Sequence, residues 1–206
     1  MANTTETDTD IVHRLRNHIE IVGGLLRLHA DHVEDGSALD LLRKLRARLA
    51  ALEETSFLTV ARPHDPAPVR PVIEAIASAI ARIYDDRSRH RCVVAGDDFR
   101  LDAVELAVVG QIFAEYLSTI YSRRSLRDVA TDVVATIGQD AAGVVSMSVR
   151  DLNFVAEREA EEPVDRLTAR MMSALLGGIA GDAQFDDASV FNARLTFKAR
   201  VAPTAG

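Results

Sequence analysis

The spacing of apolar residues near the N-terminus constrains the fold more than any other feature. In residues 11–33 the apolar positions alternate three and four residues apart: Val12, Leu15, Ile19, Val22 and Leu26. This is the heptad spacing of a helix that packs against other helices along one narrow seam. Residues 11–33 therefore predict a helix whose apolar seam belongs to a helical bundle.

A second segment, residues 38–58, has the same spacing. Its apolar positions are Ala38, Leu42, Leu45, Leu49 and Leu52, and we expect this leucine seam to be core. The two segments predict an antiparallel helical hairpin. Because a lone hairpin leaves much of its seam exposed, two hairpins from two chains would close a four-helix bundle, and we expect a homodimer.

His13 lies one residue outside the seam of the first helix, and Asn17 lies one turn further along the same flank. From His13 onward the chain reads HRLRN, then IEIV, then LLRL. This stretch resembles the phosphoacceptor helix of sensor histidine kinases, in the subgroup with the motif H-R-x-K/R-N before an apolar run ending S-L-L-x-L. The resemblance implies that His13 is the phosphorylated histidine.

The composition argues against several classes of protein. The formal net charge is −7 and no polybasic run is present, so nucleic acid and anionic membranes are not the expected partners. Cys92 is the only cysteine, which precludes an intrachain disulfide and argues against a thiolate zinc site. No uninterrupted apolar run approaches the ~20 residues of a membrane helix, and the N-terminus does not read as a signal peptide. We expect a cytoplasmic protein.

Four of the six prolines fall within residues 62–71, which predicts a linker between two domains. The expected organisation is a disordered tail over 1–9, the dimerisation and phosphoacceptor hairpin over 10–62, a Pro-rich linker over 63–70 and a second domain over 71–206. In the second domain the patterns predict helices over 69–84, 102–121 and 163–176, and strands over 92–95, 127–137, 143–149, 183–185 and 191–201.

This order predicts an α+β fold with helices on one face of a mixed sheet. It also resembles the ATP-binding domain that follows the hairpin in histidine kinases. The family holds Mg-ATP partly through a helix that carries a Glu and, four residues later, a metal-holding Asn. Here Glu115 is retained, but Thr119 takes the place of the Asn.

Two further features of the family's nucleotide site are altered. Asp151 ends a strand as the family's adenine-binding Asp does, but the two glycines that should follow it are missing. The family's glycine-rich lid is replaced by residues 156–163, which lack glycine and carry four carboxylates that would repel a triphosphate. We therefore expect a degenerate ATPase-like domain that binds no nucleotide and no metal, with Glu115 and Asp151 as remnants.

The resemblance then favours a histidine phosphotransferase, which passes a phosphoryl group between the aspartates of receiver domains through His13. Asn17 and Arg14 would assist at the phosphoryl group, and the receiver would supply the Mg²⁺, so no cofactor of the protein itself is expected. The residues expected to dock the receiver are Arg16, Glu20, Gly23, Gly24 and Arg27. The two glycines would serve equally well for close packing between the bundle's own helices.

Two alternatives remain open. The protein could be a non-catalytic dimeric adaptor that binds a response regulator, or an ATP-dependent histidine kinase with unusual nucleotide contacts. The other hairpin histidines, His18, His29 and His32, do not share one helix face, so we expect packing and surface roles for them rather than a metal site.

Overall fold

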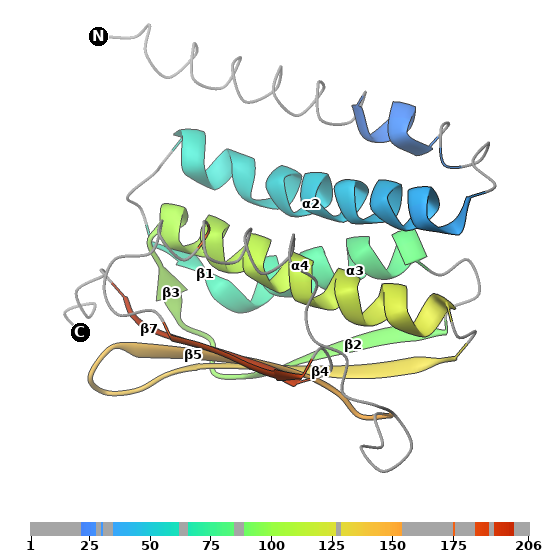
Figure 1. Ribbon diagram of the computed structural model, residues 1–206. Coiled ribbons are helices and arrows are strands. Elements are labelled where there is room, and N and C mark those ends of the chain that lie inside the picture. The colour runs from blue at the N-terminus through green and yellow to red at the C-terminus, as the bar shows by residue number, and fades with distance from the viewer. Residues whose placement is uncertain are drawn as a thin grey trace, which may run out of the picture.

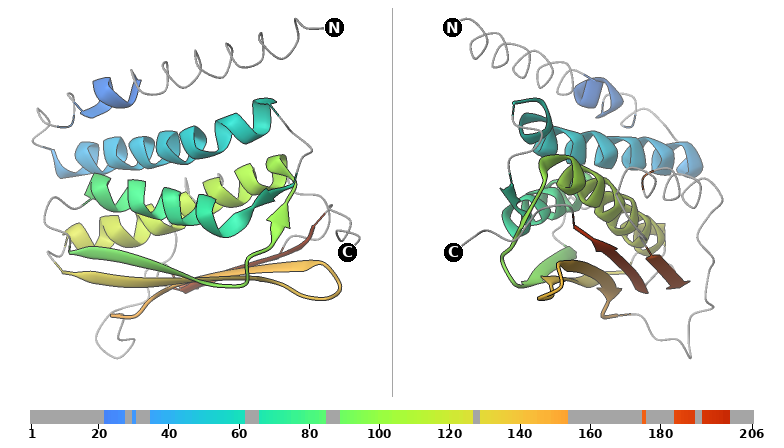
Figure 2. Two further views of the ribbon diagram at one scale, coloured as in Figure 1. Left: turned by 180° about the vertical axis from the view of Figure 1, so that it is seen from behind. Right: turned by 90° about the vertical axis from the view of Figure 1, so that its left-hand side faces the viewer.

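The computed structural model places a layer of helices on one face of a five-stranded sheet (Figure 1). The structure describes residues 22–27, 30, 35–61, 66–84, 89–126, 129–153, 175, 184–189 and 192–199. Within them the expected α+β fold with a mixed sheet is confirmed. The other face of the sheet carries no described helix (Figure 2).

The helices in this layer are α2 (Gly36–Ala61), α3 (Val69–Tyr84) and α4 (Ala103–Leu126), and residues 22–27 are also helical. The strands are β1 (Ala67–Pro68), β2 (His90–Gly96), β3 (Arg100–Leu101), β4 (Thr131–Gln139), β5 (Val144–Asp151), β6 (Gln184–Ser189) and β7 (Asn192–Lys198). The short strands β1 and β3 form a separate antiparallel pair.

Most of the predicted elements are found within one to five residues of their expected bounds. The helix predicted over 69–84 coincides with α3. The strand predicted from residue 127 begins later, at Thr131, and the pair β1–β3 was not predicted because a two-residue strand has no periodicity. The helix predicted over 163–176 lies outside the described residues except for Leu175, which is helical.

The five-stranded sheet has the order β2-β4-β5-β7-β6. β2 and β4 are parallel, with His90 opposite Thr131, and the other neighbours are antiparallel. A parallel pair needs a long crossover connection, and α4 supplies it between β2 and β4. This connection places α4 directly on the sheet.

α4 is the central helix of the fold. Asp102 caps its N-terminus, because its Oδ1 accepts a hydrogen bond from the Val104 backbone N–H at 2.8 Å. By length and hydropathy the stretch Ala103–Ser125 could cross a membrane, but 78% of its apolar window is buried inside the protein. It is apolar on all sides because the sheet covers one side and α2 and α3 cover the others (Figure 2).

α2 packs on α4 through a face that the heptad pattern does not contain. Ala47, Ala51 and Thr55 are buried there. With 3.6 residues per turn, Leu45 and Leu49 project from the opposite side of α2. The leucine seam therefore lies on the side of α2 away from α4, and its expected place in the core of a two-chain bundle stays a prediction.

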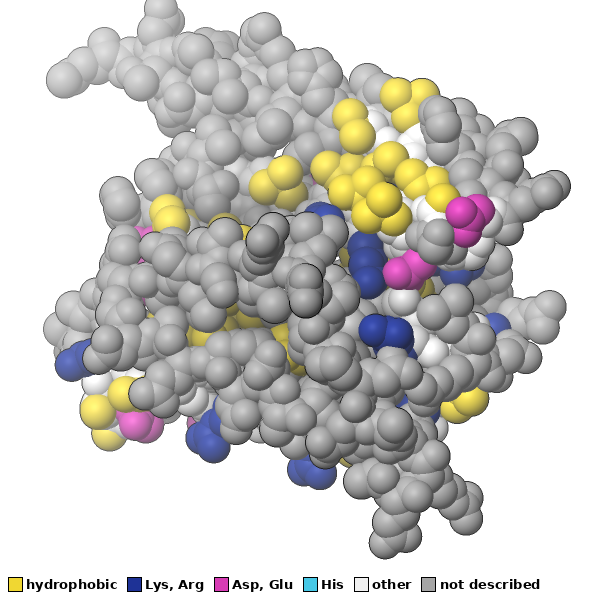
Figure 3. Space-filling model, in the orientation of Figure 1, with side chains coloured by type: hydrophobic (Ala, Val, Ile, Leu, Met, Phe, Trp, Pro, Cys, Tyr) yellow, Lys and Arg dark blue, Asp and Glu magenta, His cyan; other side chains and the backbone are white. Residues whose placement is uncertain are grey.

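The residues of the leucine seam remain only partly covered. Leu42, Leu45 and Leu49 are half-buried, and Leu52 is 41% exposed. Leu41 beside them is 47% exposed. Figure 3 shows hydrophobic side chains gathered over α2 and the neighbouring helical residues 22–27, a larger apolar surface than scattered single residues produce.

The close approach of β2 to β4 at Gly96, the last residue of β2, can be tested by substitution. Its φ is +114°, and a Cβ there would lie 1.8 Å from the carbonyl oxygen of Ile137 in β4. We expect Gly96→Ala to lower the free energy of unfolding by at least about 2 kcal/mol, because backbone strain and a clash with a neighbouring strand act together.

Gly143→Ala is the matched control for Gly96→Ala in urea-induced unfolding. Gly143 also has a positive φ, +80°, but a Cβ there meets no atom within 4 Å. Its cost should be strain alone, about 1 kcal/mol. Equal effects of the two substitutions would contradict the close approach of Gly96 to β4.

Candidate functional site

The predicted phosphoacceptor group lies at the start of the chain. His13, Arg14, Arg16, Asn17 and Glu20 lie outside the described residues. Their expected roles therefore stay predictions.

The predicted docking residues Gly23, Gly24 and Arg27 lie in the helical residues 22–27. Arg27 is exposed and the glycines are half-buried. A Cβ on either glycine would have no described atom within 4 Å. Within the described part of one chain, the glycines are therefore not needed for close helix packing.

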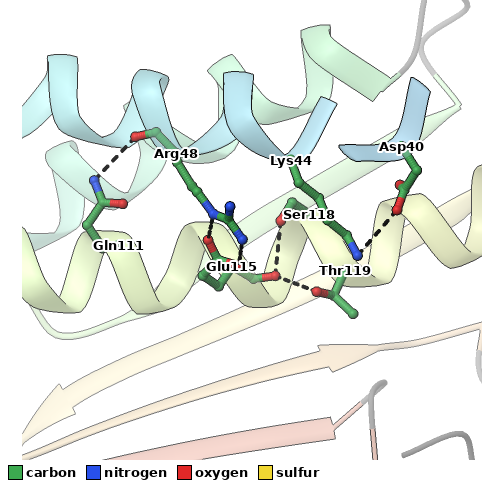
Figure 4. A network of polar contacts seen from close by, with 7 residues as sticks. All are labelled: Asp40, Lys44, Arg48, Gln111, Glu115, Ser118 and Thr119. Atoms are coloured by element: carbon green, nitrogen blue, oxygen red, sulfur yellow. Dashed lines mark hydrogen bonds and ion pairs between the residues drawn. The ribbon is translucent and has the colours of Figure 1, made fainter. Parts of the chain in front are cut away.

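Glu115 lies in the middle of α4 and faces α2 (Figure 4). It is only 1% exposed, and both of its carboxylate oxygens are taken by Arg48 of α2. Arg48 Nε donates to Oε1, and Nη2 donates to Oε2 at 3.1 Å. This two-point geometry is the fork-to-fork pairing that arginine and carboxylate prefer.

Thr119 occupies the position that the resemblance assigns to a metal-holding Asn. It is buried, and its hydroxyl donates to the backbone carbonyl of Glu115 at 2.7 Å. Ser118 donates to the same carbonyl at 3.0 Å. Both hydroxyls therefore donate to a backbone carbonyl of their own helix, one turn back along the chain (Figure 4).

α2 presents a second cation beside Arg48. This is Lys44, one turn earlier, whose Nζ lies 3.3 Å from Asp40 Oδ2. Figure 4 shows both side chains on the side of α2 that faces α4. Arg43 adds a contact to α3, with its guanidinium carbon 5.9 Å from the ring centroid of Tyr84. Burial raises the pKa of the Tyr84 phenol well above its usual value, so this ring stays neutral.

Asp151 ends β5, where the resemblance assigns adenine recognition. Its Oδ2 accepts a hydrogen bond from Arg124 Nε at 2.5 Å, and its Oδ1 accepts one from the Asn153 backbone N–H at 2.8 Å. Arg124, in the last turn of α4, is 2% exposed. Both oxygens of Asp151 are thus used inside the fold.

Sequence reasoning missed both arginine partners. Arg48 and Glu115 are 67 residues apart, and Arg124 and Asp151 are 27 apart, so no short motif joins them. The one available signal for Arg48 is its place beside Ala47 and Ala51, small residues four apart that mark a second packing face on α2.

The described residues contain no group of three or more His, Cys, Asp and Glu side chains that could hold a metal. Cys92, on β2, is half-buried, and burial raises the pKa of its thiol to about 12. A thiol with that pKa is protonated near neutral pH and is a poor nucleophile. Among the described residues, the two carboxylates that the resemblance singles out thus lie in ion pairs with Arg48 and Arg124.

Comparison with known proteins agrees with this fold. Residues 10–84 match the family model described as histidine kinase. The blue-light activated histidine kinase of Erythrobacter litoralis EL346 superposes with a TM-score of 0.62 at 16% identity, covering 97% of this chain and 61% of that chain. The histidine kinase domain of the same enzyme gives 0.52 at 16% identity, covering 95% and 92%.

No curated protein matches the sequence. The chain spans about three fifths of the full-length Erythrobacter enzyme. At 16% identity the superpositions show the fold alone, and in this respect the chain is histidine-kinase-like.

Replacing Arg124 tests the Asp151 pair. We expect Arg124→Met to lower the free energy of unfolding by about 3–5 kcal/mol, because it leaves the Asp151 carboxylate buried without its cation. Urea-induced unfolding monitored by circular dichroism measures the change.

Arg70→Met is the matched control. Arg70 pairs with Glu74 one turn along α3, at 2.9 Å, but both side chains are largely exposed. Such a pair contributes at most about 1 kcal/mol. A loss below about 1 kcal/mol for Arg124→Met as well would mean that Asp151 does not depend on Arg124.

Proposed function

We propose that the protein is a histidine phosphotransferase of a two-component phosphorelay, acting in the cytoplasm without binding ATP. The observation that carries the proposal is the engagement of Glu115 and Asp151. The resemblance assigns these two carboxylates to Mg-ATP, and in this structure both buried carboxylates pair with arginines instead. The histidine motif stands in a segment that matches the histidine kinase family model.

The chemistry assigned to His13 is a two-step transfer. A neutral imidazole nitrogen attacks the phosphorus of a receiver's aspartyl phosphate, so that an N–P bond forms while the O–P bond breaks and the carboxylate leaves with its electron pair. A second receiver's carboxylate then attacks the same phosphorus, and the imidazole leaves. Imidazole suits both steps because it is partly unprotonated and nucleophilic near pH 7.

The receiver brings the Mg²⁺ that neutralises the transferring group, so the protein has to present and orient the ring. In this proposal Asn17 and Arg14 contact the phosphoryl group. Arg16, Glu20, Gly23, Gly24 and Arg27 form the docking surface. The open space beside Gly23 and Gly24 supports a role in docking, because a receiver helix needs small residues to approach closely.

The arrangement at Asp151 supports the absence of ATP binding. An adenine would have to reach an oxygen of Asp151, but this side chain is 0% exposed, and its Oδ2 accepts from Arg124 and its Oδ1 from the Asn153 backbone N–H. Opening the buried pair to admit a base would leave the Arg124 charge without its partner, which is costly.

The arrangement at Glu115 supports the same conclusion for a metal. A cation would have to displace Arg48 from both oxygens, and Thr119 directs its hydroxyl to the helix backbone. The four carboxylates of residues 156–163 add repulsion toward a triphosphate.

The first experiment follows acid-labile phosphate on His13. We mix the purified chain with radiolabelled ATP alone, or with a panel of receiver domains carrying radiolabelled aspartyl phosphate. We expect label from at least one receiver and none from ATP. His13→Gln should reduce the label to background, because it removes the nucleophile.

His18→Gln is the matched control, since it removes a neighbouring imidazole from the same predicted helix and should leave labelling intact. Label arriving from ATP alone would show a working histidine kinase. Absence of label from every receiver, with a receiver still bound, would indicate the adaptor. Either result contradicts the phosphotransferase.

The proposal includes a homodimer in which the leucine seams of two hairpins pair. Leu41 and Leu52 of α2, with Val22 and Leu25 of the first helix, are the exposed large apolar side chains of this surface. We expect Leu52→Glu to weaken the dimer at least about 100-fold. A two-fold interface contains each residue twice, and each buried leucine contributes about 1.5–3 kcal/mol.

Analytical ultracentrifugation measures this change. Val93→Glu is the matched control, because Val93 is 54% exposed but lies on β2, away from the hairpin. A wild-type protein that is monomeric at tens of micromolar, or an equal effect of Val93→Glu, would exclude the seam as the interface.

A further inference from the structure

The contact between α2 and α4 is built from small side chains. Ala47 and Ala51 are fully buried on α2, and Gly110 of α4 lies against Thr55 of α2 and Ile76 of α3. A Cβ on Gly110 would lie 3.4 Å from Cγ2 of Thr55 and 2.9 Å from Cδ1 of Ile76. The two helices therefore approach closely, but a smooth surface of small residues does little to fix how one helix is rotated or shifted on the other.

Arg48 and Glu115 supply a contact with a defined direction. The guanidinium contacts both oxygens of a carboxylate that is 1% exposed. The Arg48 backbone carbonyl also accepts a hydrogen bond from Gln111 Nε2 at 3.3 Å, one turn before Glu115 on α4. One residue of α2 is thus held from two successive turns of α4 (Figure 4).

The hydrogen bonds of this pair depend more strongly on the relative orientation of the two helices than apolar packing does. A planar guanidinium and a carboxylate form two parallel hydrogen bonds only in one relative orientation. Rotation of α2 would break the pair and leave Glu115 charged in an enclosed site, which is strongly unfavourable.

We propose that Arg48 and Glu115 lock α2 onto α4 in a single register, so that the helical hairpin and the sheet move as one body. Glu115 is then a positioning residue and not a ligand of metal or nucleotide. The lock holds the leucine seam outward, toward the position in which a second hairpin would pair with it.

Where the lock concerns phosphotransfer, it rests on the proposed function. A receiver then docks on a hairpin whose helix α2 is held in one position relative to α4 and the sheet. Forward and reverse transfer then use the same pre-set geometry, and no domain movement is needed between the two steps.

The test measures the distance between α2 and the sheet. In a Cys92→Ser background, spin labels replace the exposed residues Glu54 on α2 and Thr136 on β4. Unlabelled protein in excess suppresses distances between the chains of a dimer. We expect one narrow distance distribution in the otherwise unchanged protein, and a broadened or shifted distribution in Glu115→Gln.

Arg48→Lys is the second variant, because it keeps the charge and therefore the fold but loses the two-point contact. It should broaden the distribution as well. Glu74→Gln is the matched control, since it removes an exposed partner of Arg70 on α3 and should leave the distribution narrow. A distribution that stays narrow and unshifted in Arg48→Lys overturns the lock, whether or not Glu115→Gln folds.

Phosphotransfer from a receiver is measured on the same variants. If the distance distribution broadens in Arg48→Lys but the wild type accepts no phosphate from any receiver, the lock is supported and the phosphotransferase is rejected. Transfer that proceeds normally while the distances stay narrow in Arg48→Lys would keep the phosphotransferase and reject the lock.

Discussion

The burial of α4 on all sides is the constraint on which the rest of the structure depends. A helix with the sheet beneath it and two helices above it has no side that faces water along most of its length, so a buried charge on it needs a compensating group. Glu115 finds Arg48 on α2, and Arg124 finds Asp151 at the end of β5. These two pairs tie α4 to the layer above and to the sheet below.

The same constraint explains why the two carboxylates that the resemblance singles out both have arginine partners. A carboxylate in an enclosed site is stable only while something compensates its charge. In the nucleotide site that the resemblance implies, a metal ion and a hydrogen-bond donor of the base would serve; in this structure Arg48 and Arg124 pair with the two carboxylates. The resemblance in sequence is preserved at Glu115 and Asp151, but the interactions of these residues are internal.

The sequence predicted the elements well because their patterns are local. The apolar face of α3 and the alternation in β5 are visible within a single window of residues, and both elements are found where expected. The orientation of α2 was not predictable in the same way. Its leucines form the stronger pattern, yet its alanines make the contact with α4, because small residues permit the closest approach.

The candidate site shows the same division. Glu115 and Asp151 could be named from their motifs, and the loss of the neighbouring Asn and glycines was visible in the sequence. Their partners could not be named, since Arg48 and Arg124 become neighbours of these carboxylates only in three dimensions. The position of His13 lies outside the described residues, so its role rests on motif and resemblance.

The Arg48–Glu115 pair also has a consequence for the order in which the molecule assembles. α2 leaves the ribosome before α4 exists, and its two packing surfaces, the alanines and the leucines, are then both uncovered. A contact that spans 67 residues closes late, because the chain entropy of the intervening segment has to be lost first. In the interval the leucine seam can find a partner on the preceding helix of the same hairpin, so we expect the hairpin to form during synthesis and α2 to pack on α4 afterwards.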